Sequence, residues 1–444
     1  MKCRIFSGNR VADVLGHLEG YPAIYIVADR NVAHLARRVA DALRDREQAE
    51  PGSKTVSGSW SSAASEQESR TVSESCGRAA SKPFGQDDAA DSGRLRGLFL
   101  LDATEQDKSM ATILDICKWL MDNAADRDAL LLAIGGGIIT DLAGFAASIY
   151  KRGIRCAYIP TTLLSQVDAA IGGKTGVNLG NYKNILGIIR QPEFTYICPE
   201  ALETLPYRDF LSGAAELLKT FIIDDSDGNY EKAVAVLSEI HRSDDHSQAI
   251  ARHKAELEEL ISAAGMVKAG IVERDELETG ERLKLNLGHT FAHAIEWESR
   301  SMQMSSDSDS DETKALTQNG ISHGEAVAIG IVLAARLSEA YYGRRSSAGS
   351  TDSTACGEAE SSAGVACAGD CIDLDKSLSC SLVEDFRQCG IPVDCPFPVE
   401  SLAGAMRKDK KAEGGIVHFV LIRSIGDVCI EDLSVEAALR LLTK

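Results

Sequence analysis

The sequence predicts an α/β domain with a buried parallel sheet, followed by a second domain that is mainly α-helical. Three observations lead to this fold class. The chain has 444 residues, which is more than one typical hydrophobic core contains. Short apolar runs rich in β-branched residues occur in the first half, whereas helical periodicity dominates from Pro206 onward. We therefore place the domain boundary near Leu205, between residues 1–205 and 206–444.

The first domain is expected to contain four buried strands, and its helices follow them. One helix starts at about Val32, a second opens at Glu105 and Lys108, and a third carries Asp141. The strands are expected at about residues 22–28, 98–101, 129–134 and 156–159.

The second domain is expected to consist of helices that end in a short terminal strand at 417–422. The predicted helices cover residues 209–223, 230–240, 250–272 and 324–342. Three tracts without periodicity, rich in small and polar residues, interrupt the chain at about residues 46–94, 299–316 and 346–380. Because these insertions lie between the motifs described below, we expect them to be surface excursions.

The composition limits the partners and the location of the protein. The net charge of -19 argues against non-specific nucleic-acid binding, which needs a basic face. The first residues contain no apolar run typical of a signal peptide, and no stretch reaches the roughly 18–20 apolar residues of a membrane span. We expect a cytoplasmic protein without membrane or nucleic-acid partners. Six of the twelve cysteines lie between Cys356 and Cys395 without a C-x-x-C pair, which favours reduced thiols over a disulfide cluster or metal site.

Two glycine-rich segments are candidate anion sites. Gly135-Gly136-Gly137 follows a predicted strand and precedes a helix, so its free amides and the helix dipole favour a phosphate. The spacing differs from the dinucleotide fingerprint, and a tight turn without a ligand is the alternative. The second segment, Gly172–Asn178, resembles a P-loop, but Asp168 occupies the place of its first glycine. We reject an ATPase and expect a flexible anion-binding loop there.

A carboxylate and imidazoles from three segments form a candidate metal site. His289 and His293 are four residues apart, which places both on one face of a helix. Together with Glu216 and His323, they offer the ligand types of a catalytic zinc site with one open position. Helical geometry alone leaves open whether His293 is a fourth ligand. Ordinary helix residues are the alternative for each residue taken singly.

Basic residues near these motifs lie singly beside glycines and apolar residues, where an ammonium or guanidinium group needs a partner. A phosphate or carboxylate on a ligand would supply that partner. The set comprises Arg152, Lys174, Lys183, Lys219, Lys268, Arg282 and the pair Lys410-Lys411.

The ordered motifs resemble the 3-dehydroquinate synthase family, the shikimate-pathway members of the sugar phosphate cyclases. The resemblance covers nearly the whole chain outside the three insertions. Two departures, Lys151 and Ala292, do not affect an assigned role. The matching motifs are Gly135-Gly136-Gly137 with Asp141 and Gly144-Phe145, Tyr150-Lys151-Arg152-Gly153, Pro160-Thr161-Thr162, Gly173–Asn178, Lys183-Asn184, Glu216 with Lys219, Asn286–Phe291 with His293, His323-Gly324-Glu325 and Asp409-Lys410-Lys411.

The resemblance implies a Rossmann-like NAD-binding domain and a helical metal-binding domain, with the active site between them. It assigns Glu216, His289 and His323 to Zn2+ or Co2+, and makes His293 a phosphate contact and proton carrier. The implied NAD contacts are Asp29, Glu105, Lys108, Gly136, Gly137, Asp141, Thr161, Thr162, Lys174 and Lys183. The implied substrate contacts are Asp168, Lys174, Asn184, Lys219, Lys268, Arg282, Asn286, His293 and Lys410, with Arg152 reaching a neighbouring site in a homodimer.

The implied reaction converts 3-deoxy-D-arabino-heptulosonate 7-phosphate to 3-dehydroquinate and phosphate, with NAD acting catalytically rather than being consumed. The alternatives are another sugar phosphate cyclase, a metal-dependent polyol dehydrogenase of related fold, and a non-catalytic scaffold. Lys268 and Arg282 beside Lys174 favour a substrate that carries a carboxylate as well as a phosphate.

Overall fold

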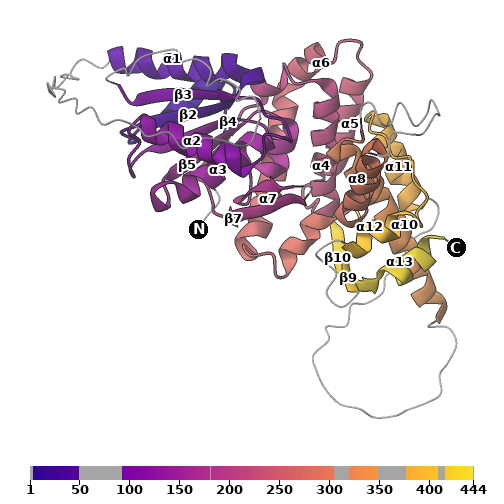
Figure 1. Cartoon of the computed structure of the whole chain (residues 1–444). Helices are drawn as coiled ribbons and strands as arrows, with labels where there is room; N and C mark the ends of the chain where they lie inside the picture. The colour runs from indigo at the N-terminus through magenta and orange to yellow at the C-terminus, as the bar shows by residue number, and fades with distance from the viewer. Residues whose placement is uncertain are drawn as a thin grey trace, which may run out of the picture.

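The N-terminal half is a six-stranded parallel sheet with helices on both faces (Figure 1). The computed structural model describes residues 4–49, 93–180, 182–304, 320–348, 377–408 and 416–443. In the order in which they lie side by side, the strands are β1 (Ile5–Ser7), β8 (Thr195–Ile197), β5 (Arg155–Pro160), β4 (Leu130–Gly135), β2 (Ile24–Asp29) and β3 (Leu95–Leu101). The helices that cover it are α1 (Ala33–Ala49), α2 (Met110–Asp122) and α3 (Gly137–Ile149).

Alternation along the central strands produces the two layers of core. Successive side chains of a strand point to opposite faces of its sheet. Ile24 and Ile26 of β2 therefore pack on the side of α1, in a core that includes Leu35. Tyr25 and Val27 pack on the other side, in the core that contains residues of α2 and α3. Both faces are covered, which explains why these strands are apolar throughout.

The order of the strands produces a topological switch point at the carboxyl end of the sheet. The chain leaves β2 to form β3 on one side, and then returns to form β4 on the other side of β2. At such a switch point, the loops after the two neighbouring strands diverge, and ligands bind in the space between them. Asp29 ends β2 and Gly135 ends β4, so both lie at this switch point.

The C-terminal half is mainly helical, as predicted. The elements are α4 (Tyr207–Ile223), α5 (Asn229–His241), α6 (His246–Arg252), α7 (Lys254–Arg274), α8 (His289–Met304), α10 (His323–Ala348), α11 (Leu378–Gln388), α12 (Leu402–Lys408), β9 (Ile416–Ser424), β10 (Asp427–Ser434) and α13 (Val435–Leu442). Helices α4, α8 and α11 pack against α10, α7 packs against α4, and a small antiparallel sheet precedes the last helix (Figure 1). The division near Leu205 stays a prediction.

Helix α10 contains the described segment that is long and apolar enough to cross a membrane, His323–Gly343. Of the most apolar 18-residue window in this segment, 67% is buried inside the protein. Core helices of soluble proteins have the same length and composition, and α10 contributes Val327, Ile331 and Leu337 to the main core.

The four predicted strands are confirmed, but the prediction for Gly172–Asn178 was wrong. Instead of a flexible loop, the segment forms β6 (Lys174–Leu179), which pairs antiparallel with β7 (Tyr182–Ile189). Glycines allow the two strands to meet closely, because a Cβ on Gly187 would lie 2.0 Å from the Thr175 carbonyl oxygen. Within the segment itself, a Cβ on Gly176 would lie 3.0 Å from the Leu186 carbonyl oxygen, so this glycine also serves backbone packing within the hairpin.

Several predicted boundaries were also wrong. The helix expected at 250–272 is broken at His253 into α6 and α7, and residues 105–108 form a loop because α2 begins after its N-cap Ser109. Helices α1, α8 and α10 extend into the three predicted insertions, most of which lie outside the described residues. The short strands β1, β8 and β10 and helix α13 were not predicted. Three-residue strands such as β1 and β8 are too short to show periodicity.

Two glycines bring α8 and α10 into backbone contact at the start of α8. A Cβ on Gly330 would lie 2.1 Å from the Gly288 carbonyl oxygen. Gly288 itself has a φ of +76°, which a side chain rarely adopts, and it immediately precedes His289. This contact therefore fixes where α8 begins relative to α10.

Gly330→Ala should separate the two helices and destabilise the fold by about 1–3 kcal/mol, because the added methyl group meets backbone rather than a movable side chain. Gly343→Ala is the matched control on the same helix. No atom lies within 4 Å of its added Cβ, so this variant should be stabilised by about 0.5–1 kcal/mol through helix propensity. Urea unfolding of both variants measures the difference, and equal stability of the two would contradict the packing argument.

Candidate active site

Three helices bring a carboxylate and two imidazoles together. Glu216 of α4, His289 of α8 and His323 of α10 each offer one ligand atom, and these atoms lie within 4.8 Å of one another. Glu216 Oε1 is 3.6 Å from His289 Nε2 and 3.4 Å from His323 Nε2. The Glu216 side chain is fully buried. One carboxylate oxygen facing two ring nitrogens is the donor set expected of a catalytic zinc site.

Both imidazoles are oriented through their other ring nitrogen. His289 Nδ1 lies 3.2 Å from the Leu287 carbonyl oxygen, and His323 Nδ1 lies 3.0 Å from Glu296 Oε1. Each of these oxygens is an acceptor, so each Nδ1 donates its proton. The Nε2 atoms that face Glu216 are thereby left to act as ligands. Histidines that bind metals in proteins are held in this way.

The electrostatics of the three side chains suit a cation. Burial raises the pKa of Glu216, but the Lys219 ammonium outweighs this effect and the pKa falls to about 2. Burial, followed by Lys219, lowers the pKa of His289 well below its usual value, so this ring is neutral. Burial lowers the pKa of His323, but hydrogen bonds with Glu216 and Glu296 outweigh it and raise the pKa to about 10. A metal ion would displace that proton.

His293 lies beside this group without belonging to it. Its ring is edge-on to that of His289, with the centroids 5.7 Å apart. Among the described residues, the set of convergent ligand atoms comprises Glu216, His289 and His323. This geometry favours the interpretation of His293 as a neighbour of the metal site rather than a fourth ligand.

A buried network of charges adjoins the metal group. Lys219 contacts Glu216 Oε2, and its Nζ is 3.6 Å from Asp168 Oδ1. Lys268 Nζ donates to Asp168 Oδ1 and to the Asp168 carbonyl oxygen, both at 2.6 Å. Burial raises the pKa of Asp168, but Lys268 and Lys219 outweigh it and hold the pKa far below its usual range. Burial lowers the pKa of Lys268, whereas Glu216 and Asp168 overcome burial and raise that of Lys219.

Glu278 lies within a second cluster of residues that were predicted to contact the substrate. Its carboxylate pairs with Lys174 and accepts a hydrogen bond from Asn286 Nδ2 at 2.9 Å. Arg282 is buried next to it, where its guanidinium donates to the Gly172 and Glu276 carbonyl oxygens at 2.9 and 2.6 Å. Lys174 and Asn286, two of the predicted substrate contacts, are therefore held by a carboxylate of the chain itself.

The predicted NAD-contacting residues gather at the switch point of the sheet. Asp29 follows β2, Gly136 and Gly137 lie between β4 and α3, and Thr161-Thr162 follows β5. A Cβ on Gly136 would lie 3.0 Å from the Thr162 side chain, and one on Gly137 would lie 3.1 Å from Ala169. The two glycines therefore let the N-terminus of α3 pack closely against Thr162 and Ala169, and the backbone amides of a helix N-terminus are the donors that a phosphate site requires.

Lys108 and Asp141 form an ion pair at the same edge, with Nζ 2.6 Å from Oδ2. Burial raises the pKa of Asp141 to about 6, although Lys108 acts in the opposite direction. Glu105 lies on the preceding loop and accepts from Asn178 Nδ2 at 2.8 Å. Asn178 also accepts from the backbone of Asn184 at 2.9 Å, so it joins this loop to the hairpin.

One predicted site residue, Arg152, is not brought into the cluster, and another lies outside the described residues. Arg152 is exposed at the end of α3 opposite to Gly137, and therefore at the far edge of the sheet. Lys410 lies outside the described residues. The remaining predicted residues lie around the metal group, the Asp168 network, the Glu278 cluster, the hairpin or the switch point.

Sequence reasoning missed three residues that contact the predicted site: Asn178, Glu278 and Glu296. Glu296 could have been found, because it lies seven residues after His289 and three after His293, on the same helix face. Asn178 was noted in a motif without a role. Glu278 has no comparable signal, since it belongs to a loop and has a φ of +60°.

Comparison with known sequences identifies the family. Residues 98–212 match the family model of the 3-dehydroquinate synthase N-terminal domain, and residues 213–307 match that of its C-terminal domain. A 3-dehydroquinate synthase of Acidithiobacillus ferrooxidans is 38% identical over 334 residues, which cover 74% of this chain and 76% of the relative. That of Pyrococcus abyssi is 35% identical over 338 residues, or 76% of this chain and 82% of the relative.

Solved structures show the same fold. A 2-epi-5-epi-valiolone synthase of Streptomyces hygroscopicus, solved with NAD+ and Zn2+, aligns with a TM-score of 0.65 at 22% identity and covers 100% of this chain and 97% of its own. A 2-deoxy-scyllo-inosose synthase, solved with carbaglucose-6-phosphate, NAD+ and Co2+, gives a TM-score of 0.65 at 17% identity and covers 99% and 98%. With the identity to its curated relatives, this fold shows that the chain belongs to the 3-dehydroquinate synthase family.

Proposed function

We propose that this chain is a 3-dehydroquinate synthase, a phosphorus–oxygen lyase of the shikimate pathway. It converts 3-deoxy-D-arabino-heptulosonate 7-phosphate to 3-dehydroquinate and phosphate. The observation that carries the proposal is the buried Glu216 carboxylate, which faces two imidazoles with one oxygen and Lys219 with the other. The metal-ligand set is in direct contact with the buried Lys219 ammonium. A substrate bound at this site would therefore meet a cation and a proton donor at the same time.

In this proposal, Glu216, His289 and His323 hold Zn2+ or Co2+, and the switch point of the sheet holds NAD. The relatives solved with NAD+ and Zn2+ or Co2+ support this assignment. When bound, the metal would supply Lewis-acid polarisation of a substrate hydroxyl, and NAD would supply a reversible hydride acceptor for the carbon that bears this hydroxyl. The NAD contacts are those predicted from the resemblance, with the backbone amides at the N-terminus of α3, at Gly136 and Gly137, receiving the pyrophosphate.

The buried lysines provide the chain's own contribution to substrate binding. Asp168 holds the Lys268 and Lys219 ammonium groups close together, so they present positive charge without moving when an anion arrives. Arg282 and Asn286 flank them at the Glu278 cluster. Lys174 is shared between the NAD and substrate contacts, and Asn184 and Lys410 complete the substrate set.

His293 is positioned to carry a proton. It is half-buried, one helical turn after His289, and therefore close to the metal group without being part of it. An imidazole there can take the proton that is lost when phosphate is eliminated.

We also propose a cytoplasmic homodimer. Arg152 lies at the far edge of the sheet from the metal group, so a second subunit would be needed for it to reach an active site. The two-domain division near Leu205 belongs to the same proposal, with the substrate between the halves.

Phosphate release from the heptulosonate phosphate should depend on added NAD and a divalent metal, without net accumulation of NADH. The reason is that the hydride is returned within each turnover. A coupled phosphate assay, read in parallel with absorbance at the NADH wavelength, measures both quantities. Sustained NADH production would indicate a polyol dehydrogenase, and no turnover with metal restored would indicate a scaffold. Turnover of a neutral heptulose phosphate in preference would indicate another cyclase.

His289→Ala should lose bound zinc, whereas His293→Ala should retain it. The first change removes a ligand, and the second removes only a neighbouring ring. His293→Ala should still lose about 10²–10⁴-fold in kcat as a general acid–base group. Elemental analysis per chain and steady-state kinetics test the pair. Equal metal loss in both variants would make His293 a ligand.

Asp168→Asn should destabilise the metal-free protein by about 3–5 kcal/mol at neutral pH, because it leaves the buried Lys268 ammonium without its carboxylate and leaves Lys219 with Glu216 alone. The folded pKa of Asp168 lies below its ordinary value of 3.8, so its stabilisation is fully present above that pH and is lost as pH falls further. Urea unfolding across pH measures this, and the difference between variant and wild type should shrink in acid.

The control is Asp128→Asn, which breaks an exposed ion pair with Arg155. Its effect should stay below about 1 kcal/mol. A similar loss in the two variants would mean that the Asp168 network does not hold the fold.

A further inference from the structure

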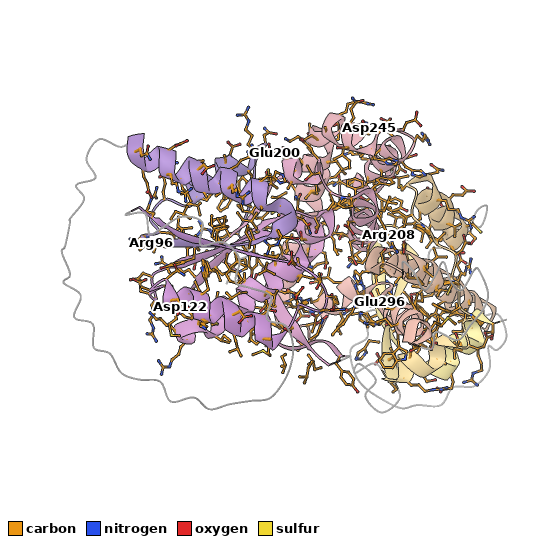
Figure 2. The ribbon with its side chains drawn as sticks, turned by 45° about the horizontal axis from the view of Figure 1, so that its top comes forward. Arg96, Asp122, Glu200, Arg208, Asp245 and Glu296 are labelled. Atoms are coloured by element: carbon orange, nitrogen blue, oxygen red, sulfur yellow. The ribbon has the colours of Figure 1, made fainter. Side chains whose placement is uncertain are left out.

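Glu296 links the predicted metal site to the hairpin, and no role has been assigned to it. It lies on α8, and its side chain is nearly buried, with 9% of its surface exposed. Figure 2 shows Glu296 in the helical half of the molecule. A carboxylate this far from water needs strong partners, because the desolvation of an unpaired charge costs several kcal/mol.

Its two oxygens have different partners. Oε1 accepts from His323 Nδ1 at 3.0 Å, while Oε2 lies 3.6 Å from Lys183 Nζ of β7 and 3.8 Å from the Arg300 guanidinium. Arg300 Nε donates instead to the Glu296 backbone carbonyl at 3.1 Å. The close, directional contact of the carboxylate is therefore the one with His323.

That contact determines what His323 can do. A neutral imidazole carries one proton, and an acceptor at Nδ1 keeps it there. Once the ring is neutral, Nε2 therefore has the free lone pair, and this atom lies 3.4 Å from Glu216 Oε1. An ionised acceptor also makes the imidazole a stronger base and fixes the orientation of its ring.

His289 provides an internal comparison. Its Nδ1 is held by the neutral Leu287 carbonyl oxygen at a longer distance, 3.2 Å. The backbone thus orients one imidazole, and the position of that backbone is fixed by Gly288. His323 is the first residue of α10, and a side chain on a different helix, Glu296 of α8, orients it instead.

We propose that Glu296 is a positioning residue of the metal site, which holds His323 in the tautomer and orientation needed to bind the metal. The proposal rests on the proposed function, because it requires Glu216, His289 and His323 to be the ligands. Loss of such an outer carboxylate typically weakens metal binding about 10–100-fold.

The test is titration of the metal-free full chain with Co2+ alone, followed by its visible absorption bands and by competition with a chelator. Glu296→Gln should weaken Co2+ binding about 10–100-fold and alter the bands, because the amide can present either an acceptor or a donor to Nδ1. Glu296→Ala should weaken binding at least as much. Circular dichroism and urea unfolding of the metal-free variants show whether each folds.

Glu298→Gln is the matched control. It removes the same charge two residues further along α8, and Glu298 forms no ion pair or hydrogen bond among the described residues. Its Co2+ affinity and bands should equal those of the wild type. Equal weakening by Glu298→Gln would show that only net charge matters and would overturn the positioning role.

Two further outcomes separate this inference from the proposed function. If Glu296→Gln and Glu296→Ala fold and give the same Co2+ bands as the wild type, the role of Glu296 alone is overturned. No Co2+ binding by the wild type would overturn the metal site, and this inference with it.

Discussion

The site depends on one buried negative charge. Glu216 is enclosed by α4, α8 and α10, and a carboxylate in that position cannot be solvated by water. Lys219 compensates one of its oxygens from within the same helix. The other oxygen faces two ring nitrogens, and a cation bound there would complete its compensation. Helices α4, α8 and α10 therefore pack around a buried negative charge, and this charge favours the binding of a cation.

The charged side chains next to Glu216 also lie beside groups of opposite sign. Lys219 also lies near Asp168, which in turn accepts from Lys268, so positive and negative groups alternate away from the metal group. Alternation keeps each buried charge next to an opposite one, and it avoids the cost of an isolated charge. The acidic net charge of the chain does not conflict with an anionic substrate, because the local groups set the potential inside the site.

Much of this could be predicted from the sequence, and the failures have a physical pattern. The strands ending at Asp29 and Gly135 were found because their apolar runs are too short for a typical helix and end at turn residues. The three residues Glu216, His289 and His323 were found from ligand type and from the family motifs. Contacts between segments that are distant in sequence were missed. Glu278 meets Lys174 across 104 residues, and no local pattern encodes such a meeting. The pairing of β6 with β7 was missed because its glycines looked like a loop.

The hairpin formed by β6 and β7 has a consequence for ligand affinity. Its strands pair with each other and not with the main sheet. Three of its side chains contact residues outside the hairpin. Asn178 contacts Glu105, Lys174 contacts Glu278, and Lys183 contacts Glu296. A ligand that takes over Lys174 or Lys183 has to exchange partners with a carboxylate already in place. The measured affinity of that ligand is then the difference between the free energy of its own contacts and that of the ion pairs it replaces. The existing ion pairs therefore favour selective binding over strong binding.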